Sequence, residues 1–384
     1  MADIQALTSE VVERILALHT DGELLSCYLG VDPTDSDRLP LELRAERERL
    51  IRTASGKIPV EQLDALLDSV DEVAADLLAP RPARPRTIAG FIPISIGDDA
   101  ASEPIWCELP ELEQTRLYVG AAVHAVPLLR QLELYRPAAV VLLAQDQYAL
   151  FDWSAGGLHE RGREQFEIDS DRWLDPEGGA PGRDSVPQGD GPARSGIGDE
   201  RAFEHRLHQT SLATLVDRIG GPLATALGRD VRRCFWIGDG PLVTGVRDRV
   251  RATLPNDVQH IDAGAHHLLT ESKDAIHEHV LEASERAWRE ASVAARLRLT
   301  TLPPSLRAQG PDEVLELANA GQVDIGFIDG MIVDNELHPD WVGTLDEAIG
   351  SIARHGGIVH VLDRDEDELA PVDGEELVVA TLRW

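Results

Sequence analysis

The sequence contains few of the residues on which several classes of protein depend. Its three cysteines, Cys27, Cys107 and Cys234, lie far apart and form no C-x-x-C pair, which excludes a disulfide framework and a zinc knuckle. We expect them to be buried free thiols. No apolar run approaches the roughly 18 residues that a membrane span needs, and the N-terminus lacks the basic and apolar regions of a signal peptide. These absences predict a cytoplasmic protein without membrane contacts.

Basic residues are also scarce. The sequence has 36 lysines and arginines against 68 aspartates and glutamates, which gives a formal net charge of -32. Lys57 and Lys273 are the only lysines, so every other cation is an arginine. Neutralising the phosphates of duplex DNA requires clustered cations, and this composition therefore argues against a DNA-binding protein. A local arginine-lined segment remains compatible with RNA contacts.

The overall composition is that of a folded chain, and the length predicts two or three domains. Hydrophobic residues make up 43% of the 384 residues and charged residues 27%, which excludes fibrous and wholly disordered classes.

Leu63, Leu67 and Val70 have the spacing of a coiled-coil seam, but the segment is short and packing on a sheet is favoured. In the first third of the chain, periodicity predicts helices at residues 7–18, 39–53 and 60–77, and strands at residues 24–31, 88–96, 105–109 and 117–119.

Strands and helices alternate through the rest of the chain. A helix from Pro127 is expected to stop before Pro137, and Gly220-Gly221-Pro222 is expected to end a helix that begins at Glu200. The remaining predicted helices are residues 243–254, 270–299, 312–320 and 344–355, and the remaining strands are residues 138–144, 148–153, 158–168, 234–237, 258–261, 323–328, 358–362 and 377–384. Together these elements predict an α/β fold.

No motif for a nucleotide, a metal ion or a serine nucleophile is complete. Gly238-Asp239-Gly240 lacks the third glycine of a dinucleotide loop and is predicted to be a turn, and neither a Walker pattern nor a G-x-S-x-G elbow occurs. His266, His267, His277 and His279 are close in sequence. However, His277 and His279 would face about 200° apart on a helix and could not share one ion. The acidic run at residues 363–368 lacks calcium-loop spacing. We therefore expect no cofactor and no metal.

The segment of residues 175–199 is rich in glycine and proline and has almost no large apolar residue. A loop longer than about 15 residues inside a compact domain is usually either functional or disordered. Glycine lets the backbone approach a ligand closely, and arginine suits phosphate contacts. The candidate RNA-binding residues of this loop and the following helix are Gly178, Gly179, Arg183, Arg194, Arg201 and His205. A disordered surface insertion is the alternative interpretation.

Three segments in order resemble one family of translation proteins. They are PLLRQLELYRP running into VVLLAQDQYALF at residues 127–151, VLELANAGQVDIGFI at residues 314–328, and VVATLRW at residues 378–384. These segments resemble the bacterial relatives of the archaeo-eukaryotic class-one peptide-chain release factors and Pelota, a group that includes Balon-type ribosome hibernation factors. The first third of the chain is similar to the family through Ser26-Cys27-Tyr28-Leu29 after the first helix.

The resemblance implies a three-domain release-factor-like α/β architecture. An N-terminal α/β domain would span residues 1–125, and a mixed-sheet middle domain with the long loop would span residues 126–270. A connecting helix would span residues 271–299. The last domain, residues 300–384, would be an αβα sandwich resembling kink-turn-binding ribosomal proteins.

The resemblance also implies a function on the ribosome. It predicts a translation factor that occupies the A site in place of tRNA during hibernation, stress or rescue, with ribosomal RNA and a translational GTPase elongation factor as partners. Gly178-Gly179-Ala180 stands where release factors carry Gly-Gly-Gln, and Ala180 replaces the glutamine that assists hydrolysis. We therefore expect no catalytic residue and no peptide release. The Asn-Ile-Lys-Ser type stop-codon signature is absent as well.

Two other functions remain consistent with the sequence. One is a peptidyl-tRNA hydrolase that rescues ribosomes by using another polar residue of the loop, such as Gln188. The other is an acidic protein-interaction module that does not bind RNA.

Overall fold

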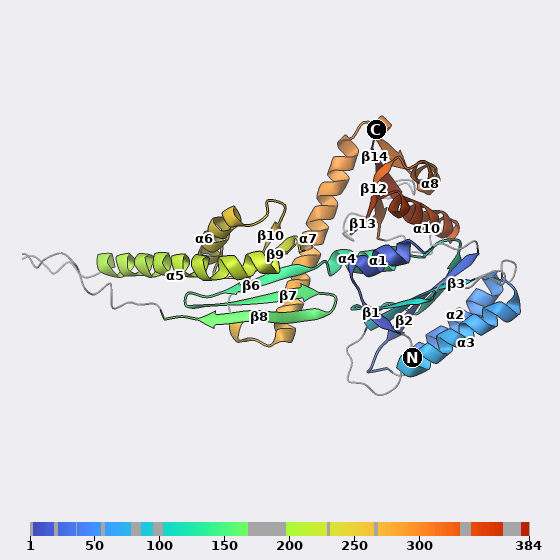
Figure 1. Cartoon of the computed structure of the whole chain (residues 1–384), viewed down its shortest axis with the longest axis horizontal. Coiled ribbons are helices and arrows are strands. Elements are labelled where there is room, and N and C mark those ends of the chain that lie inside the picture. The colour runs from blue at the N-terminus through green and yellow to red at the C-terminus, as the bar shows by residue number, and fades with distance from the viewer. Residues whose placement is uncertain are drawn as a thin grey trace, which may run out of the picture. The chain divides into compact units, whose positions relative to one another are not determined.

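The computed structural model describes residues 3–18, 22–35, 37–54, 58–77, 86–94, 103–167, 197–228, 231–264, 268–330, 339–363 and 378–383. The chain divides into two compact units, Met1–Arg136 with Ser284–Trp384 and Pro137–Ala283. Strands of the described residues form three sheets, each with parallel and antiparallel pairs (Figure 1). The predicted α/β class is therefore confirmed. No helix in the described part of the chain is long and apolar enough to cross a bilayer.

The first unit begins with a five-stranded sheet in the order β1-β4-β3-β2-β5. Its strands are β1 (Ile4–Ala6), β2 (Glu23–Val31), β3 (Arg86–Ile94), β4 (Ile105–Leu109) and β5 (Arg116–Gly120). Strands β2 to β5 were predicted, whereas β1 was not. The predicted helix at residues 7–18 is also shorter, because α1 spans Ser9–Leu16 and the side chain of Thr8 caps it by accepting from the amide of Val11.

Two helices cover one face of this sheet, α2 (Arg38–Ala54) and α3 (Val60–Leu77) (Figure 1). Leu63, Leu67 and Val70 of α3 are buried in one cluster with residues of β2 and β3. Packing on a sheet, the favoured interpretation of this pattern, is confirmed, and the coiled-coil alternative is wrong. Burial of these three side chains against the sheet stabilises α3, even though some positions of α3 hold residues of low helix propensity.

Helix α2 also covers the open edge of the sheet at β5. An edge strand leaves a row of backbone N–H groups without partners. The carboxylate of Glu42 accepts from the amide of Thr115 at 2.9 Å, and the carboxylate of Glu46, one turn later, accepts from the amide of Leu117 at 3.1 Å. The side chains of α2 therefore bind the edge that would otherwise remain open to another strand.

The first unit also contains a four-stranded sheet in the order β11-β14-β12-β13. Its strands are β11 (Arg307–Gln309), β12 (Val323–Asp329), β13 (Ile358–Leu362) and β14 (Val378–Leu382), and its helices are α7 (Lys273–Thr301), α8 (Pro311–Asn319) and α10 (Pro339–Arg354). Gly326 of β12 faces Ile352 of α10, whereas Ile325 and Phe327 share a hollow with Leu299 of α7. Helices therefore lie on both faces, as the sequence predicts, and β11 is an additional strand.

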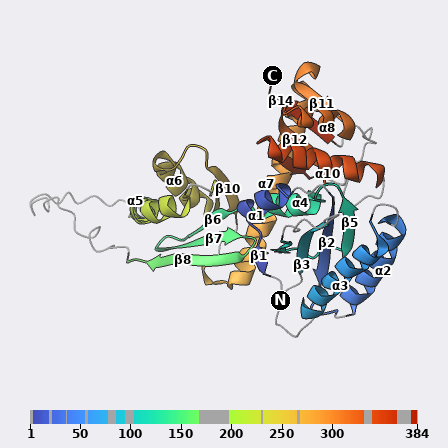
Figure 2. The ribbon, with the colours of Figure 1, turned by 45° about the vertical axis from the view of Figure 1, so that its right-hand side comes forward.

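Buried polar contacts join the parts of the first unit. Helix α4 (Val126–Leu134) follows β5, and Nδ1 of His124 before it lies 3.0 Å from the carboxylate of Asp346 in α10. Burial raises the pKa of Asp346. Figure 2 shows α1, α4 and α10 together beside β5. His360 of β13 lies 2.6 Å from the carboxylate of Glu133 in α4. The His124–Asp346 pair is buried and the His360–Glu133 pair is half-buried, and both help to fix which surfaces of the elements meet.

The second unit is built on a five-stranded sheet in the order β10-β9-β6-β7-β8. Its strands are β6 (Ala138–Leu143), β7 (Gln147–Ser154), β8 (Gly157–Gln165), β9 (Arg233–Gly238) and β10 (Gln259–Gly264). Helices α5 (Ile197–Ala226) and α6 (Gly240–Val250) cover one face (Figure 1). On the other face, Trp153 donates from Nε1 to Nδ1 of His277 in α7 at 3.1 Å. Strand β9 pairs in parallel with β6 and with β10, and β9, α6 and β10 form a βαβ unit.

Helix α5 corrects a sequence prediction. The segment Gly220-Gly221-Pro222 was expected to end the helix, but α5 continues through it to Ala226. Leu223 and Leu227, beyond the proline, are fully buried in the same core cluster as Ile219 on the previous turn. Burial of these side chains outweighs the hydrogen bond that Pro222 cannot donate.

Replacing Gly220 and Gly221 with alanine is expected to stabilise the protein by about 1 to 2 kcal/mol, because glycine inside a helix costs about 1 kcal/mol relative to alanine. A Cβ at either position meets nothing within 4 Å. Urea unfolding midpoints measure the change. Gly245→Ala is the matched control in α6, where the new Cβ would lie 2.6 Å from Leu212, so no gain is expected there. A loss of stability in the double variant would contradict a continuous α5.

Candidate functional site

The described residues test none of the predicted RNA-binding side chains. Gly178, Gly179, Arg183 and Arg194 lie outside the described residues, as do Ala180 and Gln188. The backbone of α5 contains Arg201 and His205, but their side chains are not among those described. All the predicted RNA-binding residues therefore remain predictions. Near the loop, the described residues include only the strand before it and the helix after it.

Cysteine chemistry is excluded by burial. Cys27, Cys107 and Cys234 are buried and free, as predicted. Burial raises the pKa of Cys27 and of Cys107 to about 12, and it raises the pKa of Cys234 as well. Because the thiolate is the nucleophilic form, these thiols stay protonated at neutral pH and belong to the core.

The histidine cluster serves structural contacts. His277 accepts from Trp153, whereas Nε2 of His279 donates to the carbonyl of Ala263 at 2.6 Å. The two imidazoles therefore bind different partners, in agreement with the predicted facing of the two residues. His266 and His267 lie outside the described residues. Within the described ranges, no group of histidine, cysteine, aspartate or glutamate side chains is placed to hold a metal ion.

The Gly238-Asp239-Gly240 segment connects β9 directly to α6, with Gly238 ending the strand, Asp239 at the N-cap and Gly240 beginning the helix. Gly238 has φ +153, and a Cβ there would lie 2.5 Å from the carbonyl oxygen of Leu143 in β6. Only glycine allows this close approach of two strands. The conformation is thus explained by packing in the sheet and requires no ligand.

The base of the long loop is fixed by contacts between α5 and the sheet. Arg218 of α5 forms an ion pair with Glu164 of β8, and the hydroxyl of Tyr148 in β7 donates to the same carboxylate at 3.3 Å. The amide of Phe166 donates to the carbonyl of Asp146 at 2.9 Å, just before the described chain stops at residue 167. The helix that carries Arg201 and His205 is therefore anchored on the strand that leads into the loop.

A cluster of arginines at the end of α6 was missed in the sequence. Arg247 and Arg249 occupy the last turn of α6, and Arg251 follows in a 3-10 turn, Arg251–Thr253. Arg249 donates to Oε1 of Gln209 in α5 at 3.5 Å. This contact directs the end of α6 toward the N-terminal part of α5, the part that contains Arg201 and His205. We call Arg247, Arg249 and Arg251 the α6 arginine cluster.

The surroundings of the α6 arginine cluster carry a net positive charge. Arg247 is 3.5 Å from Asp248, and in the described part of the chain no carboxylate is paired with Arg249 or Arg251. The pKa of His260 in β10 is lowered, first by burial and then by the charges of Arg251 and Arg247. The indole of Trp236 donates to Nδ1 of His260 at 3.1 Å, which holds this imidazole in the neutral form.

Such a cluster can bind anions, since guanidinium groups donate in pairs to phosphate oxygens. It also stabilises the C-terminus of α6, where cations interact favourably with the helix dipole. The alternation Arg247-Asp248-Arg249-Val250-Arg251 is the signal that points to the cluster in the sequence, although similarly spaced arginines occur elsewhere, as at Arg81, Arg84 and Arg86. Its proximity to α5 depends on tertiary packing.

Comparison with known proteins finds similarity only among solved structures. No protein-family model matches the chain, and no curated protein matches it. A chain of a model of ribosome-bound archaeal Pelota and ABCE1 is 11% identical, with 99% of this chain and 95% of that chain covered and a TM-score of 0.38. The archaeal translation termination factor aRF1 is 15% identical, with 99% of both chains covered and a TM-score of 0.23.

Dom34 of S. cerevisiae is a third structure to which the chain is similar. It is described as a translation termination-like factor that interacts with Hbs1, and it is 10% identical, with 81% of this chain and 82% of that chain covered and a TM-score of 0.39. The chain is thus similar to Pelota, Dom34 and release-factor structures, and the likeness concerns the fold. With TM-scores below 0.5, these matches identify no partner or activity for this chain.

Proposed function

We propose that the chain is a ribosome-associated translation factor. The observation that carries the proposal is the order of the three release-factor-like segments, each of which forms regular elements. Residues 127–151 cover β6 and parts of α4 and β7, residues 314–328 cover parts of α8 and β12, and residues 378–382 form β14. The proposal thus rests on three sequence segments that occur in the same order as in the family, across two thirds of the chain. The mixed sheets β10-β9-β6-β7-β8 and β11-β14-β12-β13 are compatible with it.

Within this proposal, the factor occupies the A site in place of tRNA during hibernation, stress or rescue in the cytoplasm. The three-domain division at residues 125, 270 and 299 belongs to the same proposal. The loop of residues 175–199 would approach the peptidyl-transferase centre, with Gly178, Gly179, Arg183 and Arg194 next to RNA. Arg201 and His205 would extend this contact along α5, and the α6 arginine cluster would add to it. These cations offset the repulsion between phosphates and a chain of net charge -32.

A translational GTPase is proposed as the protein partner. Dom34, to which the fold is similar, is described as interacting with Hbs1, and this is a property of Dom34. For the present chain, the partner is an elongation factor of the GTPase class that delivers the protein to the ribosome. Binding of purified chain to such a factor with and without GTP tests this part of the proposal separately from ribosome binding.

Peptide release is expected to stay at the uncatalysed rate. Hydrolysis of the ester of peptidyl-tRNA requires a positioned polar group to activate or orient water, and the methyl group of Ala180 supplies none. Release of labelled peptide from ribosomal complexes with charged tRNA measures this rate, with a true release factor as the positive control. Release well above background that disappears in Gln188→Ala would contradict the proposal and identify a hydrolase.

A further inference from the structure

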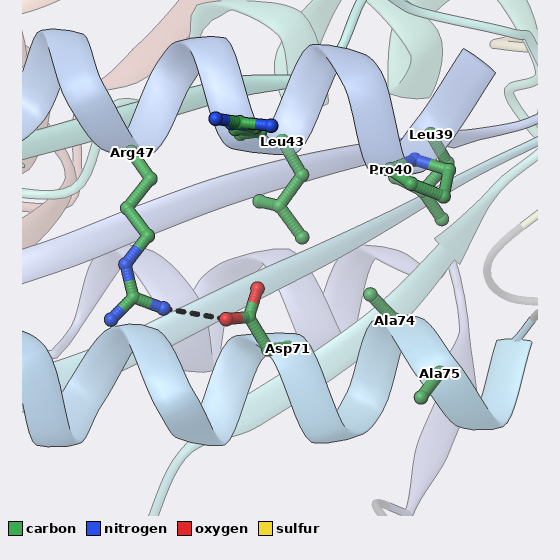
Figure 3. A pocket seen from close by; sticks show the side chains of 8 residues that line it. Leu39, Pro40, Leu43, Arg47, Asp71, Ala74 and Ala75 are labelled. Atoms are coloured by element: carbon green, nitrogen blue, oxygen red, sulfur yellow. Dashed lines mark hydrogen bonds and ion pairs between the residues drawn. The ribbon is translucent and has the colours of Figure 1, made fainter. Parts of the chain in front are cut away.

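A groove lies between α2 and α3 of the first unit, apart from every residue used in the proposed function. Its volume is about 320 Å³. It is lined by Leu39, Pro40, Leu43, Arg44 and Arg47 of α2 and by Asp71, Ala74 and Ala75 of α3. Figure 3 shows the side chain of Leu43 in the space between the helices and the short side chains of Ala74 and Ala75 on the opposite helix.

The hollow exists because the two helices contribute side chains of different size. Leu39 and Leu43 are buried and form the apolar floor, whereas α3 offers only methyl groups opposite them. At one end, the guanidinium of Arg47 closes the space by binding Asp71 at 2.5 Å (Figure 3). Leu41 of α2 is 67% exposed and extends the apolar surface beyond Pro40. An exposed apolar side chain beside an apolar hollow is typical of a docking surface.

The groove is lined by two arginines of α2, Arg44 and Arg47, and by one acid of α3, Asp71, and α3 carries further acids beside it. The residues of α3 include Glu61, Asp64, Asp68, Asp71, Glu72 and Asp76, and this helix contains no lysine, arginine or histidine. Arg47 is bound by three of these acids, at 3.5 Å from Asp64, 3.0 Å from Asp68 and 2.5 Å from Asp71. One guanidinium therefore neutralises only part of their charge. The other arginine of the lining, Arg44, has Glu48 within 3.5 Å.

The two helices present this groove along their length. Arg47 contacts Asp64 near the start of α3, whereas Leu39 and Pro40 lie across from Ala74 and Ala75 near its end, so α2 and α3 run antiparallel. A third helix packs well into the channel between two such helices. The apolar floor selects a large apolar side chain, and the excess of acids over the one guanidinium that they share favours cations and disfavours acidic peptides.

We propose that the groove binds a basic amphipathic helix of a partner protein. A large apolar side chain of the partner fills the hollow between Leu43 and Ala74, and lysines or arginines on its flank face Asp64 and Asp68, which lie on the α2 side of α3 and share one guanidinium with Asp71. This interaction is independent of ribosome binding, because none of its residues belongs to α5, α6 or the long loop. The partner helix would add a third helix to the layer that covers the sheet.

The test uses the full chain and a fluorescent peptide of about 18 residues, roughly five helical turns. The peptide carries leucines on one face and lysines and arginines on the other. A peptide of the same composition in scrambled order and one with glutamate for every cation are compared with it. Fluorescence anisotropy at low salt is expected to show saturable binding of the basic amphipathic peptide, at least about tenfold tighter than either comparison peptide.

Variants of the groove test the apolar contact and the charge contact separately. Ala75→Trp fills the hollow from its exposed rim, and Asp64→Lys with Asp68→Lys reverses the charge of the acids beside it. Each is expected to weaken binding at least about tenfold, and the effect of the charge reversal should shrink at high salt. Glu278→Lys with Glu282→Lys makes the same charge change at the same spacing on an exposed part of α7 and is expected to leave binding unchanged.

Leu41→Ser gives a second apolar variant at a position too exposed to affect folding, and it should also weaken binding. Absence of binding by the unaltered chain, or equal binding by all groove variants, would overturn the proposal. So would a self-associated chain that Ala75→Trp converts to monomers in light scattering, because a second copy would then be the occupant. Loss of peptide binding with intact ribosome binding would leave the proposed function untouched.

Discussion

Replacing Arg249 and Arg251 together with glutamate is expected to weaken ribosome binding at low salt by at least about tenfold. Each charge-assisted contact between an arginine and a phosphate contributes on the order of 1 kcal/mol or more, and the reversal adds repulsion. The two residues are exposed at the end of α6, next to α5, so the change leaves the core of the second unit intact. Binding is measured by co-sedimentation across a salt series, and the salt dependence should become shallower as phosphate contacts are lost.

The control is a double variant with the same charge change in the first unit, Arg286→Glu with Arg354→Glu. Both residues are exposed, on α7 and α10. If the control loses as much affinity as the α6 variant, the loss reflects the net charge of the protein, and the α6 arginine cluster is not a contact. If the α6 variant binds as well as the unaltered chain, the cluster only stabilises its own helix.

Replacing Glu46 with alanine is expected to destabilise the first unit by about 3 kcal/mol. The carboxylate of Glu46 is almost fully buried, and it accepts from Arg49 at 2.7 Å, from Arg116 at 3.1 Å and from the amide of Leu117 at 3.1 Å. Its removal leaves the buried amide of Leu117 without an acceptor and takes from Arg49 and Arg116, 39% and 35% exposed, their buried partner, and such a loss costs several kcal/mol. Urea unfolding measures the loss, and hydrogen exchange of β5 should accelerate.

Glu48→Ala is the matched control for Glu46→Ala, because Glu48 lies on the same helix, is 66% exposed and is 3.5 Å from Arg44. A change within about 0.5 kcal/mol is expected for this surface position. Equal stability of the two variants would show that the contacts of Glu46 do not hold α2 on β5. Loss confined to Glu46→Ala supports the role of α2 as the cover of this edge.

The stabilisation by Glu46 should also depend on pH. Burial raises the pKa of this carboxyl, but hydrogen bonds from Arg49 and the amide of Leu117 and the charges of Arg49 and Arg116 outweigh it, so the pKa is lowered overall. A carboxyl with a lowered pKa contributes fully above its unfolded pKa of about 4.3 and loses the contribution as the pH falls through its folded pKa. The difference between the unaltered chain and Glu46→Ala should therefore narrow in acid.

Elements with a strong local signal could be predicted closely from the sequence. The expected helix at residues 60–77 is α3, and the expected strand at residues 105–109 is β4. Local capping is a further signal of this kind, since the hydroxyl of Ser272 accepts from the amide of Ala275 at 3.2 Å at the start of α7. These features depend on periodicity and capping within a few residues, which the sequence contains directly.

Elements whose conformation depends on distant partners could not be predicted. Strands β1 and β11 are three residues long, too short for a period, and each exists because it pairs with a neighbour, β1 with β4 and β11 with β14. Local breakers in Gly220-Gly221-Pro222 suggested a helix end, but the burial of Leu223 is decided by the sheet beneath α5. The contact of Glu46 with Leu117 of β5 likewise joins residues 71 positions apart.

The candidate site likewise contains residues that the sequence could reveal and residues that it could not. Glycines and arginines of the long loop could be selected from composition, and their positions remain predictions because they lie outside the described residues. The α6 arginine cluster was not selected, since its three arginines also suit the exposed end of any helix. Only the contact of Arg249 with Gln209 places them beside α5.

Co-sedimentation of the purified chain with bacterial ribosomes tests the proposed function most directly. Ribosomes from growing and from stationary-phase cells are pelleted with the protein over a range of salt concentrations. The protein is expected in the pellet at low salt and is expected to move to the supernatant as salt rises, because cations displace arginine from phosphate. Protein that stays in the supernatant at every salt concentration, with both kinds of ribosome, would contradict the proposal that the chain acts on the ribosome.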